Sequence, residues 1–412
     1  MTIKKKSTLN YLLLCATSLT LLAACSTTTN SGTTSTKTST SASATTTSTK
    51  QTSSSSDHFT SADYETSYDE STASKITLNG SSAKVSGDGV AVSGSTVTIS
   101  KAGTYVISGE SDGVQIQIAA GSEDDVHIVL NGVTMTSTSA AISATQAGHV
   151  YVTLADGSTN TLSDSSSNTD EDADAALFSK VDLTINGSGT LNVNGKTNNG
   201  IKANDTLHIT GGTYNITSVG DAFNVNDELN IANATMTIDA KEDAVKVDND
   251  EDTSVGNMYL ADNTMTITAG DDAIHASGNL VIDSGTYTIK ESTEGIEGKS
   301  VTINDGKIDL YATDDGINAA NASASSDEIF VTINGGDITI EMASGDTDAV
   351  DSNGNLTVTG GNINITAQFA FDFDGTVSYT GGTVTVNGEN QTEIVADGPG
   401  GGGGGQGGFG PR

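Results

Sequence analysis

Acidic side chains recur at one position of a repeated sequence string. The string is an acid, a small residue, an apolar residue and a polar residue, as in Asp221-Ala222-Phe223-Asn224 and Asp272-Ala273-Ile274-His275. If equivalent residues stack like neighbouring β-strands, these carboxylates lie about 4.8 Å apart and need a cation or a proton to relieve their repulsion. Oxygen ligands of this kind suit Ca²⁺. The predicted metal-binding residues are Asp221, Asp243, Asp271, Asp272, Glu294, Asp314, Asp315 and Asp348.

Each of these acids also has a simpler interpretation. An Asp side chain commonly caps a turn by accepting a hydrogen bond from a backbone N–H group, and such a cap needs no metal. The sequence leaves both roles open. Among metals, Ca²⁺ is the expected cofactor, because two Cys and five scattered His are a poor basis for a zinc or copper site.

A second line of polar residues follows the acids three positions later. The apolar residue between the two lines is expected to point inward, so the second line points outward. Mixed donors and acceptors along a groove suit a hydroxyl-rich polymer, although any solvated solenoid face carries similar residues. The line consists of Lys202, Asn224, Lys246, His275, Glu297, Asn318, Asp351 and Asp372. The predicted polysaccharide contacts are Lys246, His275, Glu297, Asn318 and Asp351.

The sequence gives catalysis less support than binding. Gly270-Asp271-Asp272-Ala273-Ile274 resembles the paired acids of polygalacturonases, but the Gly-His-Gly and Arg-x-Lys strings expected after it are missing. Calcium-dependent pectate lyases commonly use an Arg base, and the single Arg of this chain is Arg412. We therefore predict no catalytic residue. The alternative is a Ca²⁺-dependent polysaccharide lyase whose base is Lys202, Lys241, Lys246 or Lys299.

The repeat itself predicts the elements that carry both lines. Its starts, from Asp174 to Phe369, are spaced 25, 22, 22, 29, 22, 21, 33 and 21 residues apart. Short alternating strands separated by a Gly turn lie within each repeat, which favours an all-β parallel β-helix with coils of about 22 residues over a leucine-rich repeat or a β-sandwich. In one coil, alternation places Leu280, Ile282, Tyr287 and Ile289 inward and Val281, Thr286 and Thr288 outward.

Residues 73–170 are rich in predicted strands but less regular than residues 171–397. A solenoid needs a cap at each end, so we interpret residues 73–170 as early coils plus an N-terminal cap. A separate sandwich domain is the alternative. Residues 171–397 are predicted to form the regular β-helix repeats.

The two ends of the chain predict an exported, anchored protein. Residues 1–25 form a signal peptide that begins with Lys4–Lys6 and closes as Leu22-Ala23-Ala24-Cys25. That last string resembles a bacterial lipobox, in which Cys25 is lipidated; an ordinary cleaved signal is the alternative. Residues 26–72 are predicted to be a Ser/Thr-rich flexible stalk and residues 398–412 a disordered Gly-rich tail.

The net charge excludes some partners. The chain has 52 acidic and 17 basic residues, which gives −35. Removing residues 1–25 removes three Lys and no acid, so the mature charge is 14 − 52 = −38. Such a chain repels nucleic acid and anionic lipid headgroups, so contact with a membrane is expected only through the lipid anchor.

Several strings carry a family resemblance. They are Ile76–Asn79, Gly103-Thr104-Tyr105, Val129-Leu130-Asn131-Gly132-Val133, Ala175-Ala176-Leu177-Phe178-Ser179-Lys180 and the acid-small-apolar coils. With them, residues 73–397 resemble the bacterial surface carbohydrate-binding β-helix family, formerly a domain of unknown function. The resemblance implies a right-handed parallel β-helix with bound Ca²⁺ that binds plant-type polysaccharides without a demonstrated cleavage activity. It assigns no individual sugar contact.

The sequence therefore predicts a Ca²⁺-stabilised lipoprotein on the outer face of a bacterial cytoplasmic membrane. Its expected partner is a polysaccharide, either a plant-type polymer or a cell-wall glycan. Direct contact with a polyuronate would be repulsive at this charge, so Ca²⁺ bridges such a ligand or the ligand is neutral. The alternatives are an adhesin or cell-wall spacer that recognises no sugar, and the lyase described above.

Overall fold

The structure is a computed structural model that describes residues 58–249, 251–345 and 347–397. The predicted signal peptide with Cys25, the stalk as far as residue 57 and the Gly-rich tail lie outside the described residues. Within the described ranges, no helix has the length and apolar character needed to cross a membrane.

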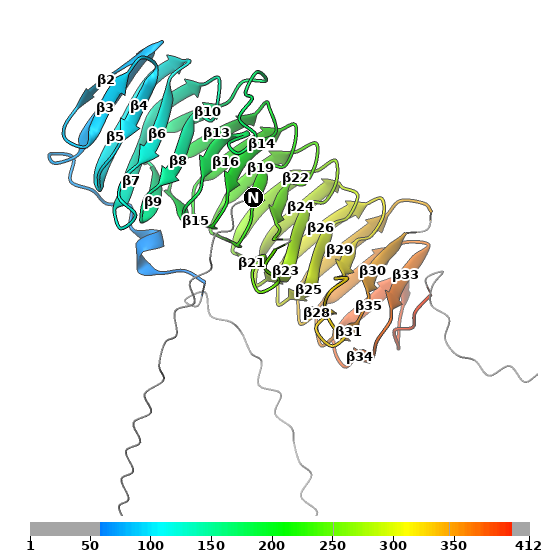
Figure 1. Cartoon of the computed structure of the whole chain (residues 1–412). Helices are drawn as coiled ribbons and strands as arrows, with labels where there is room; N and C mark the ends of the chain where they lie inside the picture. The colour runs from blue at the N-terminus through cyan, green and yellow to red at the C-terminus, as the bar shows by residue number, and fades with distance from the viewer. Residues whose placement is uncertain (1–57, 250, 346, 398–412) are drawn as a thin grey trace, which may run out of the picture. The chain divides into compact units, whose positions relative to one another are not determined.

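The coils are built from three short strands each, and each strand pairs in parallel with the strand at the same position of the next coil. Strands β14, β15 and β16 of one coil pair with β17, β18 and β19 of the next, residue by residue. We number the three resulting faces 1, 2 and 3 in chain order. Figure 1 shows strands of face 3, from β10 to β29, side by side. This pairing confirms the predicted parallel β-helix.

Strand bounds follow the faces. Face 1 contains β4 (Thr96–Ile99), β6 (Gln115–Ala119), β8 (Ile142–Gln146), β11 (Ala175–Ser179), β14 (Asn199–Ala203), β17 (Phe223–Val225), β20 (Val245–Val247), β27 (Ile317–Ala319), β30 (Asp348–Ser352) and β33 (Phe369–Phe373). Face 2 contains β9 (His149–Leu154), β12 (Leu183–Gly187), β15 (Thr206–Thr210), β18 (Glu228–Ala232), β21 (Asn257–Ala261), β28 (Phe330–Ile333), β31 (Asn355–Val358) and β34 (Val377–Tyr379). Strands β23 (Ile274–Ile282) and β25 (Ile296–Ile303) run through both faces.

Face 3 contains β10 (Thr159–Ser163), β13 (Thr190–Gly195), β16 (Thr213–Ser218), β19 (Thr235–Asp239), β22 (Asn263–Thr268), β24 (Gly285–Glu291), β26 (Lys307–Ala312), β29 (Asp337–Met342), β32 (Asn362–Thr366) and β35 (Thr383–Val386). Strands β1 (Ser74–Gly80), β5 (Gly103–Asp112) and β7 (Asp125–Thr136) are longer and run through faces 2 and 3. Residues 73–170 thus continue the stack of the later coils.

Antiparallel pairs close the two ends of the stack. At the N-terminal end, β2 (Ser82–Ser86) pairs with β1 and β3 (Val90–Ser93) pairs with β4. At the C-terminal end, β36 (Glu389–Asn390) pairs with β35. Hairpins of this kind occupy strand edges that would otherwise be open to pairing with another chain.

The core lies inside the coil and is formed by alternate side chains of all three faces. In the coil chosen above, Leu280, Ile282, Tyr287 and Ile289 are buried, whereas Val281, Thr286 and Thr288 are half-buried on the outside. On face 1, the apolar residues Phe223, Val245, Ile274, Ile296, Ile317 and Val350 are fully buried. Both sets lie as the alternation predicts.

A segment that the sequence assigned to the stalk instead packs on face 2. We call residues 58–65 the strap; it contains the short 3₁₀ helix η2 (Ser61–Tyr64). Phe59 is buried against Tyr259 and its neighbours, and the ring of His58 stacks on that of Tyr259 at 3.9 Å. Asn230 donates a hydrogen bond to the backbone carbonyl of His58 at 3.0 Å. The folded part of the chain therefore begins at least as early as residue 58 rather than at residue 73.

Asp63 is the central anchor of the strap. Its carboxylate accepts hydrogen bonds from the Thr60 backbone N–H at 2.7 Å and from the Thr184 hydroxyl at 2.6 Å, and it lies 3.2 Å from Nδ1 of His208. Burial favours the neutral forms, but these bonds and the pairing outweigh it, so the pKa of Asp63 is well below its usual range. Asp63 and Glu228 together raise the pKa of His208 to about 9 despite its burial.

These shifts predict that docking of the strap depends on pH. The pKa of His208 rises from 6.5 to about 9, so its contribution is complete below pH 6.5 and is lost as the pH rises towards 9. The pKa of Asp63 is lowered, so Asp63 stabilises the docked strap at every pH above its ordinary pKa. This stabilisation is lost only in strong acid. The charged neighbours that set this balance are Asp63 and Glu228, with His149 close by.

We expect the protection of the strap amides against hydrogen exchange, corrected for the intrinsic rate, to fall about tenfold or more between pH 6 and pH 9.5. Each unit by which docking shifts the pKa of His208 corresponds to about 1.4 kcal/mol of docking free energy, which is a factor of ten in protection. His208→Gln should flatten this dependence. Equal corrected protection at both pH values would contradict the ion-pair anchor.

Candidate functional site

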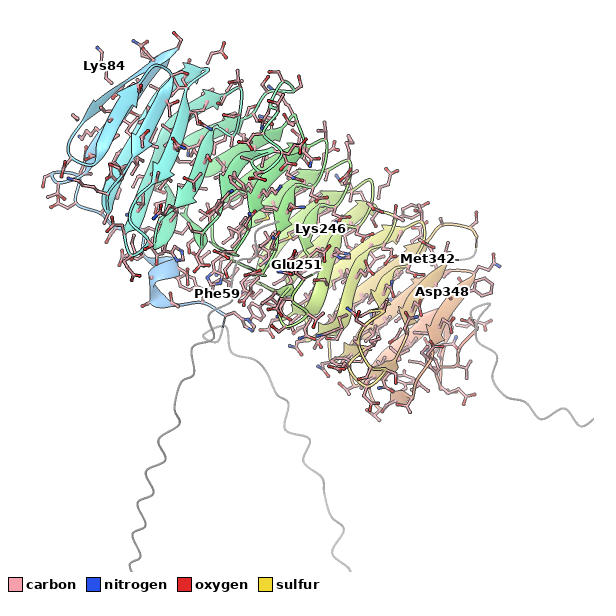
Figure 2. All side chains as sticks on the ribbon, viewed as in Figure 1. Phe59, Lys84, Lys246, Glu251, Met342 and Asp348 are labelled. Carbon is pink, nitrogen blue, oxygen red and sulfur yellow. The ribbon has the colours of Figure 1, made fainter. Side chains whose placement is uncertain are left out.

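Face 1 carries the two lines that the repeat predicts, the acids and the outward polar residues three positions later. Strand register aligns the second line across consecutive strands from β14 to β33. Its members are Lys202, Asn224, Lys246, His275, Glu297, Asn318, Asp351 and Asp372. Figure 2 labels Lys246 from this line and Asp348 from the line of acids. Consecutive members are separated by one strand spacing, about 4.8 Å.

The acids of the first line tie each coil to the next. Oδ1 of Asp221 accepts a hydrogen bond from the backbone N–H of Asp243 at 3.0 Å, and Oδ1 of Asp243 accepts one from Asp272 at 2.9 Å. The same bond joins Asp315 Oδ1 to the Asp348 N–H at 3.2 Å. These acids therefore bind a backbone N–H group, as in the alternative to metal binding, but the N–H belongs to the next coil rather than to the acid's own turn; we call this the capping role.

The second carboxylate oxygen faces the residue three positions later. Asp221 Oδ2 accepts a hydrogen bond from the Asn224 amide at 2.6 Å, and Asp243 Oδ2 accepts one from the Lys246 ammonium at 2.7 Å. Glu294 differs, because its Oε2 accepts a hydrogen bond from the amide of Asn318 in the next coil, at 2.9 Å. The two predicted lines thus form one hydrogen-bonded ladder rather than two independent sites.

Cations neutralise the N-terminal half of this ladder. Lys202 pairs with Asp174 at 2.7 Å and Lys246 with Asp243 at 2.7 Å. Nδ1 of His275 lies 3.1 Å from Asp272 and 2.6 Å from Glu297. Burial disfavours a charged His275, but its two carboxylate partners outweigh burial and raise its pKa to about 10. His275 is therefore an imidazolium cation at neutral pH.

The C-terminal half of the ladder is rich in carboxylates and poor in cations. Burial and neighbouring carboxylates raise the pKa of Glu294 to about 8, that of Asp315 to about 6 and that of Asp351 to about 7. Among the ion pairs of the described residues, none joins a Lys or His to these three acids. Their charged forms are consequently destabilised unless a cation is added from solution.

Asn318 lies in the middle of this half. Its side chain is only 7% exposed, and its Oδ1 has no hydrogen-bond partner among the described residues. The register places Asn318 between Glu297 and Asp351. A buried amide oxygen beside carboxylates is a donor set that a hard cation such as Ca²⁺ satisfies. We call the set Glu294, Glu297, Asp315, Asn318 and Asp351 the C-terminal acidic site.

The structure does not bring all eight predicted metal ligands together. Asp243, Asp271 and Asp272 place one carboxylate oxygen each within 4.8 Å of one another, and Asp272, His275 and Glu297 place one ligand atom each within the same distance. Asp271 and Asp314 are exposed at the edge of the ladder. Of the predicted sugar contacts, His275 and Glu297 belong to the second of these groups, and Asn318 and Asp351 follow Glu297 in strand register.

Sequence reasoning missed a group of side chains on face 2. His127, His149, Tyr151 and His208 all point outward there, and they line two pockets beside the strap, of about 210 and 310 Å³. The signal was present in the alternation of Val126-His127-Ile128 and Val150-Tyr151-Val152, where the middle residue points out. The repeat string is absent from these strands, so they could not be aligned with the later coils from the sequence.

The capping role predicts different effects for two neighbouring acids. Asp243→Ala removes a buried carboxylate that holds a backbone N–H and Lys246, so we expect the free energy of unfolding to fall by roughly 2 to 3 kcal/mol. Asp271→Ala removes an exposed carboxylate and should change it by less than about 0.5 kcal/mol. Urea unfolding in EDTA measures both. Equal effects would contradict the capping role.

Comparison with known proteins gives three matches. The model of the carbohydrate-binding domain-containing protein family matches residues 93–293 and 274–398. A relative of that name from Acetivibrio thermocellus is 37% identical over 136 residues, which are 32% of this chain and 47% of the relative. The solved structure of a polysaccharide lyase-like protein from C. thermocellum is similar with a TM-score of 0.50 and 27% identity, and covers 66% of this chain and 98% of its own. The chain belongs to the carbohydrate-binding domain-containing protein family.

Proposed function

We propose that this chain is a non-catalytic polysaccharide-binding protein, anchored to the outer face of a bacterial cytoplasmic membrane and stabilised by Ca²⁺. The family supports carbohydrate as the partner, and the similar structure of a polysaccharide lyase-like protein supports a polymer rather than a free monosaccharide. A solenoid offers a polymer long, regular faces along which successive sugar units find equivalent side chains.

The C-terminal acidic site is where we place Ca²⁺. The observation that carries this placement is the buried Asn318 Oδ1 without a partner, next to carboxylates whose pKa burial raises. Glu294, Glu297, Asp315 and Asp351 would hold the ion together with Asn318. The similar structure from C. thermocellum is a gadolinium derivative, and Gd³⁺ shares the preference of Ca²⁺ for oxygen ligands.

Bound Ca²⁺ would supply positive charge to a row of buried carboxylates, and it could also bridge them to a carboxylate of an acidic polymer. The chain's own residues hold the coils and the carboxylates in place. Asp315 holds the backbone of the next coil through its Oδ1, and Asn318 holds Glu294. In the N-terminal half, Lys246 and His275 take the place of a metal ion.

A non-catalytic role agrees with the state of three of the four candidate bases, Lys202, Lys241 and Lys246. A lyase base must lose its proton, but Lys246 pairs with Asp243 and its pKa is raised, so it stays protonated. Lys202 and Lys241 are paired with Asp174 and Asp239. New absorbance near 235 nm, the general mark of an unsaturated uronate, on incubation with polygalacturonate would instead support the lyase alternative. An adhesin or spacer would give no signal on a glycan array.

Calcium is expected to raise the thermal unfolding midpoint of the mature chain, because a ligand that binds only the folded state stabilises it, by about 2.7 kcal/mol at a concentration one hundred times its Kd. Glu297→Gln combined with Asp351→Asn should remove most of this rise. Glu341→Gln is the matched control, because Glu341 is an exposed acid on face 3.

Two outcomes would contradict this placement. If EDTA and Ca²⁺ give the same midpoint for the unaltered chain, the acids act as turn caps alone. If Ca²⁺ stabilises the double variant as strongly as the unaltered chain, the ion binds elsewhere, and the group Asp243, Asp271 and Asp272 becomes the next candidate.

The anchor predicts a change in cell fractionation. Cys25→Ser should move the protein from the membrane fraction to the medium or to an unprocessed precursor, because a lipid cannot be attached to Ser. Cys15→Ser, inside the signal, is the matched control and should leave the protein in the membrane fraction. Membrane retention of Cys25→Ser at the mass of the processed chain would contradict the lipid anchor, whereas a retained precursor still carries its apolar signal segment.

A further inference from the structure

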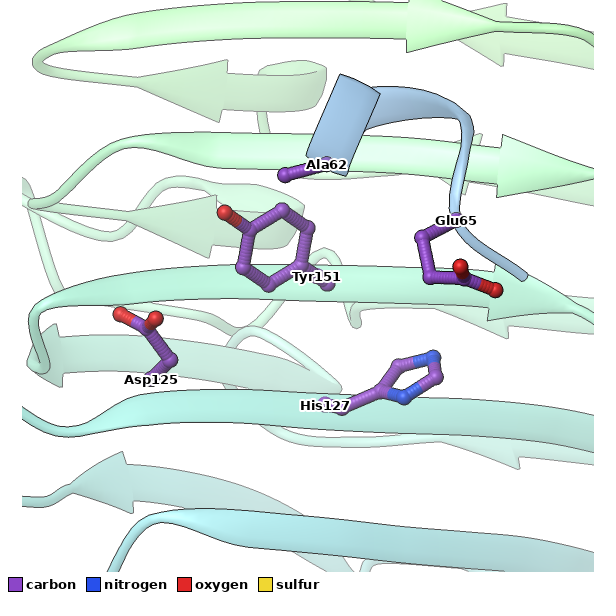
Figure 3. Close-up of a pocket in the computed structure, with 5 residues that line it drawn as sticks. All are labelled: Ala62, Glu65, Asp125, His127 and Tyr151. Atoms are coloured by element: carbon purple, nitrogen blue, oxygen red, sulfur yellow. The ribbon is translucent and has the colours of Figure 1, made fainter. Parts of the chain in front are cut away.

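The strap closes a pocket on face 2 that contains an aromatic ring and polar groups. Ala62 and Glu65 come from the strap, Asp125 and His127 from β7, and Tyr151 from β9, around a volume of about 210 Å³. Figure 3 shows the Tyr151 ring in the middle of the group, with the other four labelled side chains around it. Pockets for drug-sized ligands are about 300 to 1,000 Å³, so this volume suits a smaller unit such as one sugar ring.

One face of the Tyr151 ring is available to a ligand. The His149 imidazole covers the other face, with 4.1 Å between ring centroids and 14° between ring planes. His149 lines the second pocket, of about 310 Å³, and is not part of the first, which therefore lies on the other side of Tyr151. A half-exposed aromatic face backed by a stacked ring is a rigid platform for the C–H groups of a sugar.

A chain of hydrogen bonds fixes the state of His127. Asn186 donates both amide protons to strap carbonyls, and its Oδ1 accepts a hydrogen bond from Thr153 at 2.6 Å. The Thr153 oxygen must therefore accept from Nε2–H of His127, 2.8 Å away. This leaves Nδ1 of His127 as a bare acceptor. Burial lowers the pKa of His127, so the ring is neutral.

The two carboxylates of the pocket are also acceptors, and only the Tyr151 hydroxyl among the lining side chains can both donate a hydrogen bond to a ligand and accept one. Asp125 is exposed and makes no side-chain hydrogen bond or ion pair within the described ranges, and Glu65 uses one oxygen to accept the Ser67 N–H at 2.8 Å. Two carboxylates and a neutral imidazole require a ligand that brings hydroxyl donors. They also repel a uronate, because its carboxylate would meet like charges.

We propose that this pocket binds one neutral pyranose unit of a polysaccharide, stacked on Tyr151 and hydrogen-bonded through its hydroxyls to Asp125, Glu65 and His127. The proposal rests on the polysaccharide-binding function above and adds a site and a selectivity to it. The strap thereby forms one wall of the site, and the site is complete only when the strap is docked.

Calorimetric titration of the full mature chain tests this proposal. The probes are soluble neutral hexasaccharides of β-linked glucose, xylose and mannose, with oligogalacturonate as the acidic comparison. We expect the unaltered chain to bind a neutral probe, and Tyr151→Ala and Asp125→Asn each to weaken that binding about tenfold or more. Tyr311→Ala on β26, another half-exposed tyrosine, is the matched control and should leave the affinity unchanged.

Each result separates the site from the function. Neutral binding that Tyr151→Ala and Asp125→Asn leave intact would overturn the pocket and keep polysaccharide binding. Binding of oligogalacturonate alone would overturn the neutral selectivity, and binding of no glycan, on the array as well, would overturn both proposals. Asp125→Asn should leave the fold intact, because Asp125 is exposed and its side chain bonds no other described residue. A loss of binding in this variant therefore reports on the pocket and not on misfolding.

Discussion

Equivalent side chains of successive coils lie one strand spacing apart, and this constraint governs the whole molecule. Inside the coil the constraint is favourable, because a column of Ile, Val and Leu buries apolar surface continuously. Outside, it forces like charges to within about 4.8 Å of one another. A chain with a net charge of −35 must therefore find, for every acidic column, a proton, a cation or a hydrogen-bond donor.

Face 1 shows these solutions in sequence along the stack. Backbone N–H groups occupy one oxygen of Asp221, Asp243 and Asp315. Lys246 and the protonated His275 add positive charge in the middle. Beyond His275, burial and then neighbouring carboxylates raise the pKa of Glu294 and that of Asp351, and among the ion pairs of the described residues no Lys or His joins either acid. The proposed Ca²⁺ would supply the positive charge that Glu294 and Asp351 lack.

The regular part of the fold could be predicted because the repeat encodes its own register. Once Asp243 and Asp272 are recognised as equivalent, the pairing of Lys246 with His275 follows. The strap could not be predicted, because its contacts join residues 121 to 172 positions apart and follow no repeat. Phe59 and Asp63 also lie next to a Ser- and Thr-rich segment that is typical of a flexible stalk. They are buried only because the strap packs on face 2. Tyr151 was missed for another reason: its strand shows the alternation but lacks the repeat string that would align it with other coils.

The strap connects the two proposed properties of the molecule. Its Asp63 is held by His208 and Thr184, and its Glu65 lines the pocket of Tyr151. A ligand that touches Glu65 binds the docked strap better than the released one, so binding and docking stabilise each other by the same free energy. Because docking is weakened as His208 loses its proton, affinity for a neutral sugar should decline over the same pH range, although neither Tyr151 nor the sugar itself titrates there.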